Sequence, residues 1–319
     1  MKISIAMATF NGARYLQEQL DSFAAQTRLP DELLVCDDMS SDQTLEVLQK
    51  FARNAPFTTK IIRNERNFGY TKNFEKALVL CDGDVVFLSD QDDVWCRHKV
   101  ETVSKMFESD SAIMVVNNNA EIVDQTLRAT GRTLFSNARS VGYKSPPTYG
   151  SCTTVRSSVA QIVVPIPEHL LDYDLWINIV AGSCGVRSFV PEVLQKYRRH
   201  EENSTQGMIS ATKKPTIFEI LKEYGLRDVT EGWTKEVETR EFLEIFLKQK
   251  RAALEVLGLY EVAEESIHRE RKTVDAIKKR IELVRSPRVN RLRKIVRFLK
   301  AGGYRQFSGW RSAFKDVIR

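Results

Sequence analysis

The stretch DVVFLSDQDDVW, residues 84–95, joins an apolar run to a cluster of acids. Residues 84–88 are a short β-branched and apolar run that ends in polar residues, which is typical of a buried strand. Three similar runs come earlier in the chain, at residues 3–9 (ISIAMAT), 33–37 (LLVCD) and 59–63 (TKIIR). We therefore predict four buried strands, the last of which ends directly at the acids.

Helical periodicity fills the segments between these runs. Apolar residues recur at a spacing of three or four, as at Leu16, Leu20 and Phe23. Strands and helices that alternate at this length build right-handed crossovers, so we predict an α/β fold with a mostly parallel open sheet and flanking helices. Ligands of such sheets bind beyond the carboxyl ends of the strands. That rule selects four loops: Thr9-Phe10-Asn11, Asp37 to Ser40, Asn64 to Lys72, and Asp90 to Asp93.

Length and pattern predict two regions. The chain has 319 residues with 42% hydrophobic and 28% charged, an ordinary globular composition that suits two domains. Strand patterns stop after about residue 210. A charged helical stretch runs from 234 to 284 and ends at Ser286-Pro287. We predict a catalytic domain at 1–210 and a helical region at 211–319, whose 234–284 stretch offers a surface for oligomerisation.

Cysteine usage and hydropathy indicate in which cell compartment the protein works. The five cysteines are an odd number without metal-ligand spacing, which favours reduced thiols in the cytoplasm. The first apolar run is too short for a signal peptide. No stretch approaches the roughly 18 apolar residues of a membrane span. We expect a cytoplasmic protein whose membrane contact is peripheral.

The charge is unevenly distributed. Residues 285–319 carry eleven Lys/Arg and one acid, a net +10, so the first 284 residues carry −4 of the total +6. Basic, aliphatic and aromatic residues interleave in this tail, which favours an amphipathic helix lying on the anionic inner face of the cell membrane. A solvated helix packed on the catalytic domain is the alternative. The acidic body speaks against a nucleic-acid partner, because acids repel phosphates.

The acids at residues 90–93 predict a cation site. Asp90, Asp92 and Asp93 follow a strand with no basic residue between them. Such hard oxygen ligands suit Mg²⁺ or Mn²⁺, which usually complete their coordination with substrate phosphates. A helix N-cap with first-turn acids is the structural alternative.

Further motifs accompany these acids in a fixed order along residues 1–207. They are Ala8-Thr9-Phe10-Asn11-Gly12, Asp37-Asp38-Met39-Ser40-Ser41-Asp42, Asn67-Phe68-Gly69, Lys72-Asn73-Phe74, Asp90-Gln91-Asp92-Asp93-Val94-Trp95, Gly150-Ser151-Cys152-Thr153, Asp174-Leu175-Trp176 and Tyr197-Arg198-Arg199-His200. Together they resemble the family two glycosyltransferases of the A-type fold, particularly the rhamnosyltransferase-like enzymes of bacterial polysaccharide synthesis.

The resemblance implies an activity and its partners. It implies inverting transfer of a sugar from a nucleoside-diphosphate donor, dTDP-rhamnose or a UDP-sugar. The implied acceptor is a hydroxyl of a lipid-linked saccharide in O-antigen, capsule or exopolysaccharide synthesis. A tail held at the membrane would let a cytoplasmic enzyme reach such an acceptor.

The resemblance also implies roles for single residues. Thr9, Phe10 and Asp38 would bind the base and ribose of the donor, and Lys72 would approach the sugar nucleotide. Asp90 would bind the donor and, with Asp92, the metal; Asp92 is the more direct metal ligand and Asp93 a supporting acid.

Two residues nearer the C-terminus complete the implied site. Asp174 would be the catalytic base, although by itself it is equally an N-cap or first-turn acid of the helical run that follows. Asp172 stays open as the alternative base. His200 would complete the metal or diphosphate site, whereas a lone histidine is otherwise structural.

Two other classes of protein remain for comparison. A sugar-phosphate nucleotidyltransferase would have a Gly-rich, basic phosphate loop after the first strand, where this chain has only Gly12 and Arg14. A non-catalytic membrane or nucleic-acid binding protein would explain the basic tail but would leave the acids at 90–93 without a purpose.

Overall fold

The computed structural model describes residues 1–140, 148–167, 172–201, 203 and 229–318. The chain divides into two compact units, Met1–Lys214 and Pro215–Arg319. The boundary predicted near residue 210 falls at 204–228, outside the described residues.

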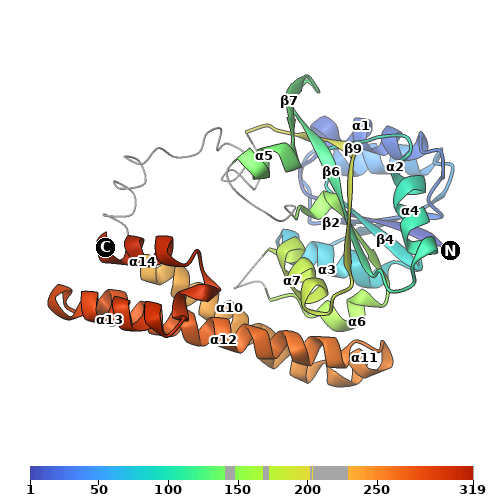
Figure 1. The fold of residues 1–319 in the computed structure, drawn as a ribbon. Helices are drawn as coiled ribbons and strands as arrows, with labels where there is room; N and C mark the ends of the chain where they lie inside the picture. Colours follow the sequence, from blue (N-terminus) through green and yellow to red (C-terminus); the bar gives the residue numbers. More distant parts are fainter. Residues whose placement is uncertain (141–147, 168–171, 202, 204–228, 319) are drawn as a thin grey trace. The chain divides into compact units, whose positions relative to one another are not determined.

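The first unit is organised around one sheet, drawn in Figure 1. Its described strands lie in the order β3-β2-β1-β4-β8-β6-β9-β5, and β7 pairs with β6. Their bounds are β1 Ile3–Thr9, β2 Glu32–Asp37, β3 Thr58–Arg63, β4 Val85–Ser89, β5 Val94–Trp95, β6 Val115–Val123, β7 Ala129–Thr133, β8 Thr153–Arg156 and β9 Arg187–Arg198.

The sheet has a parallel half and a mixed half. Strands β1 to β4 pair in parallel, as predicted from their alternation with helices. Strand β8 then runs antiparallel to both β4 and β6, and β9 pairs in parallel with β6 and antiparallel with β5. The predicted fold class is confirmed, and the sheet as a whole is mixed. The carboxyl ends of β1, β2, β3 and β4 meet at one edge.

Helices flank the sheet of the first unit. Their bounds are α1 Ala13–Ala24, α2 Thr44–Ala52, α3 Tyr70–Leu80, α4 Lys99–Ser109, α5 Leu134–Ser140, α6 Val159–Val163 and α7 Tyr173–Ser183, with a 3₁₀ turn η1 at Gly150–Cys152. Helix α1 buries Leu16, Leu20 and Phe23, as their spacing predicted. The prediction of a buried strand is wrong for β3, because β3 is the edge strand and its residues are partly exposed.

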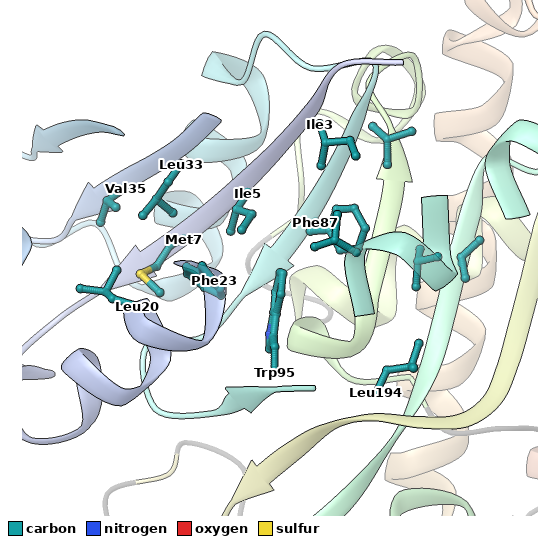
Figure 2. Close-up of a cluster of buried hydrophobic side chains, with 14 of the residues drawn as sticks. Ile3, Ile5, Met7, Leu20, Phe23, Leu33, Val35, Phe87, Trp95 and Leu194 are labelled. Carbon is teal, nitrogen blue, oxygen red and sulfur yellow. The ribbon is translucent and has the colours of Figure 1, made fainter. Parts of the chain in front are cut away.

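A single apolar cluster holds the parallel strands against α1 and α4 (Figure 2). The indole of Trp95 lies against the ring of Phe23 at a centroid distance of 4.6 Å and against that of Phe87 at 5.7 Å. Trp95 directly follows the acidic loop and is buried, so this packing fixes the far end of that loop.

The described part of the second unit, residues 229–318, is helical. The bounds are α10 Val229–Gln249, α11 Arg251–Val256, α12 Tyr260–Arg285, α13 Arg288–Lys300 and α14 Trp310–Ile318, with a 3₁₀ turn η2 at Gly303–Gln306. The predicted helical stretch is thus divided among α10, α11 and α12, and α10 packs on α12 through Val237, Val274 and Ile277. Helix α12 ends at the predicted Ser286-Pro287 break.

The tail differs from the predicted single amphipathic helix. It forms two helices, because the chain turns at Gly302, which has a left-handed φ of 75° that glycine adopts without strain. Both helices pack on α12: Leu283, Ile295, Tyr304 and Ala313 share one buried cluster. Within the described residues, no helix is long and apolar enough to cross a membrane.

Candidate active site

The four loops predicted from the sequence lie at the edge where β1 to β4 end. Main-chain hydrogen bonds link the first three of them in series. Asp38 N donates to Thr9 O at 2.8 Å, and Asn64 N donates to Asp37 O at 2.8 Å. Parallel pairing of β1 with β2 and β4, and of β2 with β3, is the cause of this convergence.

The acidic loop between β4 and β5 concentrates negative charge. Burial and the neighbouring Asp92 and Asp93 carboxylates raise the pKa of Asp90 well above its usual value. Burial, followed by the charge of Asp92, raises the pKa of Asp93 to about 7. Carboxylates held together at this cost are a common feature of functional sites, because a bound cation relieves their repulsion.

Arg198, at the end of β9, fixes the main chain of this loop. Its N–H donates to Asp93 Oδ1 at 3.0 Å, and its Nε donates to the main-chain oxygen of Asp92 at 2.7 Å. The guanidinium is buried over the ring of Tyr15 at 4.5 Å and pairs with Glu18. The sequence marked Arg198 only as part of the Tyr197 to His200 motif, and the pattern did not show its role.

A buried network beneath the loop was also missed. The ammonium of Lys99 donates to Ser151 O at 2.8 Å and to the side chain of Gln195, and it lies 3.9 Å from the Trp95 ring centre. Gln195 Nε2 in turn donates to Asp93 Oδ2 at 2.9 Å. Burial lowers the pKa of Lys99 to about 8. No spacing rule pairs a helical lysine with a glutamine 96 residues away.

His200 lies beside Asp92, as the resemblance implied. The two atoms His200 Nε2 and Asp92 Oδ2 are 2.8 Å apart, and the amide of Asn203 donates to the same oxygen at 3.3 Å. The imidazole is nearly buried against Tyr15, with ring centroids 4.7 Å apart, and its Nδ1 has no hydrogen-bond partner among the residues that the structure describes. The structure thus brings together two residues that are 108 positions apart.

These residues fit a cation only in part. Across the described ranges, no three His, Cys, Asp or Glu side chains form a group that could hold a metal ion by themselves. Asp92 and His200 nevertheless place one carboxylate oxygen and one imidazole nitrogen side by side, next to the acids Asp90 and Asp93. Mg²⁺ and Mn²⁺ often take one or two protein ligands and complete their shell with substrate phosphates. The donor set therefore suits a cation that binds together with a diphosphate.

Two of the predicted nucleotide-binding residues shape the loops from within. The buried Thr9 hydroxyl donates to Asp37 Oδ2 at 3.0 Å. The buried Asp38 carboxylate accepts the main-chain N–H groups of Phe68 and Gly69, each at 2.9 Å. Direct contact of Thr9 and Asp38 with a nucleotide stays a prediction.

Exposed apolar side chains lie on the same loops. Phe10 and Met39 are both about half exposed. Met39 itself has a left-handed backbone with a φ of 67°, and Phe10 precedes Asn11, which has a left-handed φ of 48°. A left-handed backbone at a bulky residue such as Met39 is uncommon and is concentrated at functional sites. An exposed aromatic ring beside such a turn provides a flat face on which a base can stack.

Lys72 is directed toward the segment before α7. Its Nζ donates to Glu75 Oε2 at 3.0 Å and to Ile166 O at 3.1 Å. Glu75 also accepts the N–H of Ile166 at 2.5 Å. Lys72 thus ties α3 to the chain around Ile166 in this structure, and its approach to a sugar nucleotide stays a prediction.

The two candidate bases have different surroundings at the start of α7. Asp172 is exposed at the N-cap and accepts a hydrogen bond from the Tyr70 hydroxyl. Burial raises the pKa of Asp174 to about 6, and the charge of Asp174 is in turn one of the causes that raise the pKa of Asp90. Asp174 is half-buried and feels the charge of the acidic loop, whereas Asp172 is exposed. Which of the two is the base stays a prediction.

The residue between them holds this turn in place. The buried ring of Tyr173 stacks on Phe74 at a centroid distance of 4.1 Å. A Cβ at Gly150 would lie 1.7 Å from the Tyr173 hydroxyl, so only glycine fits there. Packing of α7 on α3 and η1 therefore sets the position of Asp174.

A mixed sheet of this order, with an acidic loop after β4 and an acid at the start of a later helix, is the arrangement of the A-type glycosyltransferases. Residues 4–162 match the family described as Glycosyl transferase family 2. The chain therefore carries a glycosyl transferase family 2 domain, and the resemblance seen in the sequence is confirmed. The family match favours this class over the nucleotidyltransferase and the non-catalytic alternatives.

Curated relatives agree with this assignment. An uncharacterized glycosyltransferase of Nostoc sp. is 29% identical over 230 residues, 67% of this chain and 70% of that protein. A UDP-Glc:alpha-D-GlcNAc-diphosphoundecaprenol beta-1,3-glucosyltransferase of Escherichia coli is 25% identical over 70% of this chain and 87% of its own length. A dTDP-rhamnosyl transferase of Shigella flexneri is 33% identical over 99 residues, 30% of this chain and 34% of the relative. The chain also matches mycobacterial relatives over 59% of their length.

A solved structure shares the fold. Residues 1–349 of S. aureus TarS, in complex with UDP-GlcNAc, superimpose with a TM-score of 0.53 at 21% identity, covering 96% of this chain and 89% of that one. At this identity the likeness concerns the fold alone, which it supports.

Proposed function

We propose that this chain is an inverting glycosyltransferase. It transfers a sugar from a nucleoside-diphosphate donor to a hydroxyl of a lipid-linked saccharide during synthesis of a cell-surface polysaccharide. Catalysis is assigned to residues 1–210, and residues 211–319 form the accessory helical region.

The observation that carries this proposal is the acidic loop after β4, where Asp92 lies beside His200, in a domain that matches Glycosyl transferase family 2. Asp174, at the start of α7, supports it. Its carboxylate has a pKa raised to about 6 by burial, and it is electrostatically coupled to Asp90 in a cluster that suits a cation and a diphosphate. In an active site, acids in different environments have different pKa values and can therefore take different roles. One accepts a proton while others bind the cation and the charged leaving group.

The reaction needs one base. Asp174 accepts the proton of the acceptor hydroxyl while the acceptor oxygen forms a bond to the anomeric carbon. The bond from that carbon to the diphosphate oxygen breaks, and the nucleoside diphosphate leaves with the electron pair. Attack opposite to the leaving group inverts the anomeric centre, and no covalent sugar–enzyme intermediate is required.

Asp92, His200 and Asp90 are the residues that would hold a divalent cation, Mg²⁺ or Mn²⁺, together with the diphosphate. When bound, such a cation neutralises charge that develops on the leaving group. Arg198 keeps the loop in place through the main chain of Asp92 and Asp93.

Donor recognition is assigned to the loops after β1, β2 and β3. The exposed ring of Phe10 stacks on the base, Thr9 and Asp38 maintain the surrounding loops, and Lys72 approaches the sugar nucleotide. The names of the relatives support either a UDP-sugar or dTDP-rhamnose as donor, because one is a UDP-Glc enzyme and another a dTDP-rhamnosyl transferase.

A lipid-linked acceptor is supported by the name of the Escherichia coli relative, whose substrate is a diphosphoundecaprenol-linked sugar. We place the chain in the cytoplasm at the inner face of the cell membrane, where such an acceptor exposes its hydroxyls.

The test is a panel of nucleotide sugars presented to the purified full chain with Mg²⁺ or Mn²⁺. The donor should raise the melting temperature and be hydrolysed slowly without acceptor, and EDTA should abolish both effects. If no nucleotide sugar stabilises the protein or is turned over, the proposal is wrong.

A further inference from the structure

Helices α13 and α14 leave large apolar side chains in the solvent. On each helix three such residues recur at i, i+4 and i+7, a spacing that places them along one face. Their exposed fractions range from 40% to 68%, and they are Leu292, Val296 and Leu299 on α13 and Trp310, Phe314 and Val317 on α14. We call these six residues the apolar stripes.

The adjoining faces of the same helices are anchored in the unit. Ile295 and Ala313 are buried with Leu283 of α12. Asp316 is fully buried and accepts from Arg280 Nε at 2.6 Å and from Nη2 at 2.9 Å. Packing on both sides of the turn at Gly302 therefore holds the stripes facing outward. Their exposure is not caused by fraying of the C-terminus.

Basic residues accompany the stripes. Arg293, Arg297 and Lys300 are exposed on α13, and Arg311 is exposed on α14. The only acid between residues 285 and 319 is Asp316, and its carboxylate is buried in an ion pair with Arg280. The outward charge of this surface is consequently positive, without an acid of the same segment to offset it.

We propose that the apolar stripes insert into the interface of an anionic lipid bilayer while the flanking Lys and Arg residues contact its headgroup phosphates. Apolar and aromatic side chains beside cationic ones are the pattern of helices that lie in a membrane interface. A tryptophan at the edge of the stripe suits that position, because its amphipathic ring favours the headgroup region.

A second copy of the chain fits this surface less well. Two such faces in contact would bring like charges together, which opposes association. Nucleic acid would use the positive charge, but it gives no reason for six exposed apolar side chains at helical spacing. Charge and hydrophobicity together therefore select the anionic bilayer.

The test uses point variants. Deleting residues 285–319 is unsuitable, because it would also remove Ile295, Tyr304 and Ala313 from the buried cluster and would leave Arg280 without Asp316. The informative variant is the pair Trp310→Ser and Phe314→Ser in the full chain. Its matched control is the pair Ile245→Ser and Val256→Ser, which removes two exposed apolar side chains from α10 and α11.

Each protein is sedimented with vesicles of phosphatidylcholine, with or without phosphatidylglycerol. We expect binding only to the anionic vesicles, weakened by high salt. Loss of two side chains that would insert into the bilayer should reduce partitioning of the stripe variant by at least about tenfold. The control pair should bind as the parent does, and both variants should keep the parent's melting temperature and nucleotide-sugar hydrolysis.

Equal vesicle binding by the stripe variant and the parent would overturn the proposal, as would equal binding to neutral vesicles. If the parent is a dimer without lipid and the stripe variant is a monomer, the stripes join two copies instead. None of these results depends on the transfer activity, so failure here leaves the proposed function untouched.

Discussion

The side-chain amide of Gln91 pairs with both main-chain polar groups of Phe10. Gln91 Oε1 accepts the N–H of Phe10 at 2.9 Å, and Gln91 Nε2 donates to the Phe10 carbonyl at 3.1 Å. The side chain lies so close to Gly12 that a Cβ there would be 2.1 Å from Oε1. The middle residue of the acidic motif thus joins the acidic loop to the loop after β1, whose exposed Phe10 ring is assigned to the base of the donor.

Replacing Gln91 by alanine should weaken donor binding more than it slows chemistry. Two hydrogen bonds worth about 1 kcal/mol each position the Phe10 loop, so we expect KM for the nucleotide sugar to rise by up to about thirtyfold, with a smaller change in kcat. Gln91→Glu keeps the acceptor but loses the donor, and should fall between the parent and the alanine variant. Gln17→Ala, which removes an exposed helical glutamine bonded to Asp21, is the control. An unchanged KM in Gln91→Ala would mean that the Phe10 loop does not depend on this pair.

Asp92→Ala should abolish metal-dependent binding of the nucleotide sugar and leave the protein folded. The reason is the loss of the oxygen that faces His200 in the acidic loop. Calorimetric titration of the donor with and without Mn²⁺ measures the effect, and Glu46→Ala, which removes an exposed acid of α2, is the control. Donor affinity equal to that of the parent in the presence of metal would remove Asp92 from the metal site.

The parallel half of the sheet was predictable because its strands are short, apolar and separated by amphipathic helices. The bounds of β1 agree with the predicted run at residues 3–9, those of β2 and β3 begin one residue earlier than predicted, and β4 is shifted by one residue at both ends. The mixed half was not predicted, since the β8 to β6 pairing depends on contacts between distant segments. Local patterns carry little information about such pairs.

The site shows the same division. Asp90 and Asp92 could be picked out because they follow a predicted strand, and Asp174 and His200 because they lie in motifs of the family that the sequence resembles. Lys99 could not be, because its role depends on burial among groups that are distant in the sequence. The tail was expected to form one helix; the turn at Gly302 and the inward direction of Asp316 emerge only from tertiary packing.

Asp174→Asn should retain donor binding and lower kcat by at least about 10²-fold, the usual scale for losing a general base. Asp172→Asn is the matched comparison, because Asp172 lies two residues away and is exposed. We expect a small effect from it. A large loss in Asp172→Asn combined with near-normal turnover in Asp174→Asn would transfer the role of base to Asp172.

The pH dependence follows from the raised pKa of Asp174. A base must be deprotonated to accept a proton, so kcat/KM should rise with pH through about 6 and then level off. The same shift affects stability with the opposite sign. A carboxyl whose pKa is raised by burial from 3.8 to about 6 favours folding when protonated, and that contribution is lost as pH rises through 6. Asp174→Asn should therefore melt no lower than the parent at neutral pH, and a lower melting temperature would contradict this account of its burial.

Breaking the Arg280–Asp316 pair should destabilise the second unit far more than breaking a surface pair. The guanidinium of Arg280 lies 4.3 Å from the Trp233 ring centre and 4.6 Å from that of Phe307, and Tyr304 also donates to Asp316 at 2.9 Å. Removing the acid leaves a buried cation without its counter-charge, for which the usual cost is about 3–5 kcal/mol of unfolding free energy.

Urea denaturation followed by circular dichroism and Trp fluorescence measures this cost in Asp316→Ala. The control is Lys248→Ala, which breaks an i,i+4 pair with Glu244 on the surface and should change stability by less than about 1 kcal/mol. The double variant Arg280→Met with Asp316→Leu should recover much of the loss, because neither charge then remains buried. In Asp316→Ala the tail helices should detach from α12, and the apolar stripes should lose their orientation. This variant should therefore also show altered vesicle binding. A cost for Asp316→Ala no larger than that for Lys248→Ala would show that the tail is held by its apolar contacts alone.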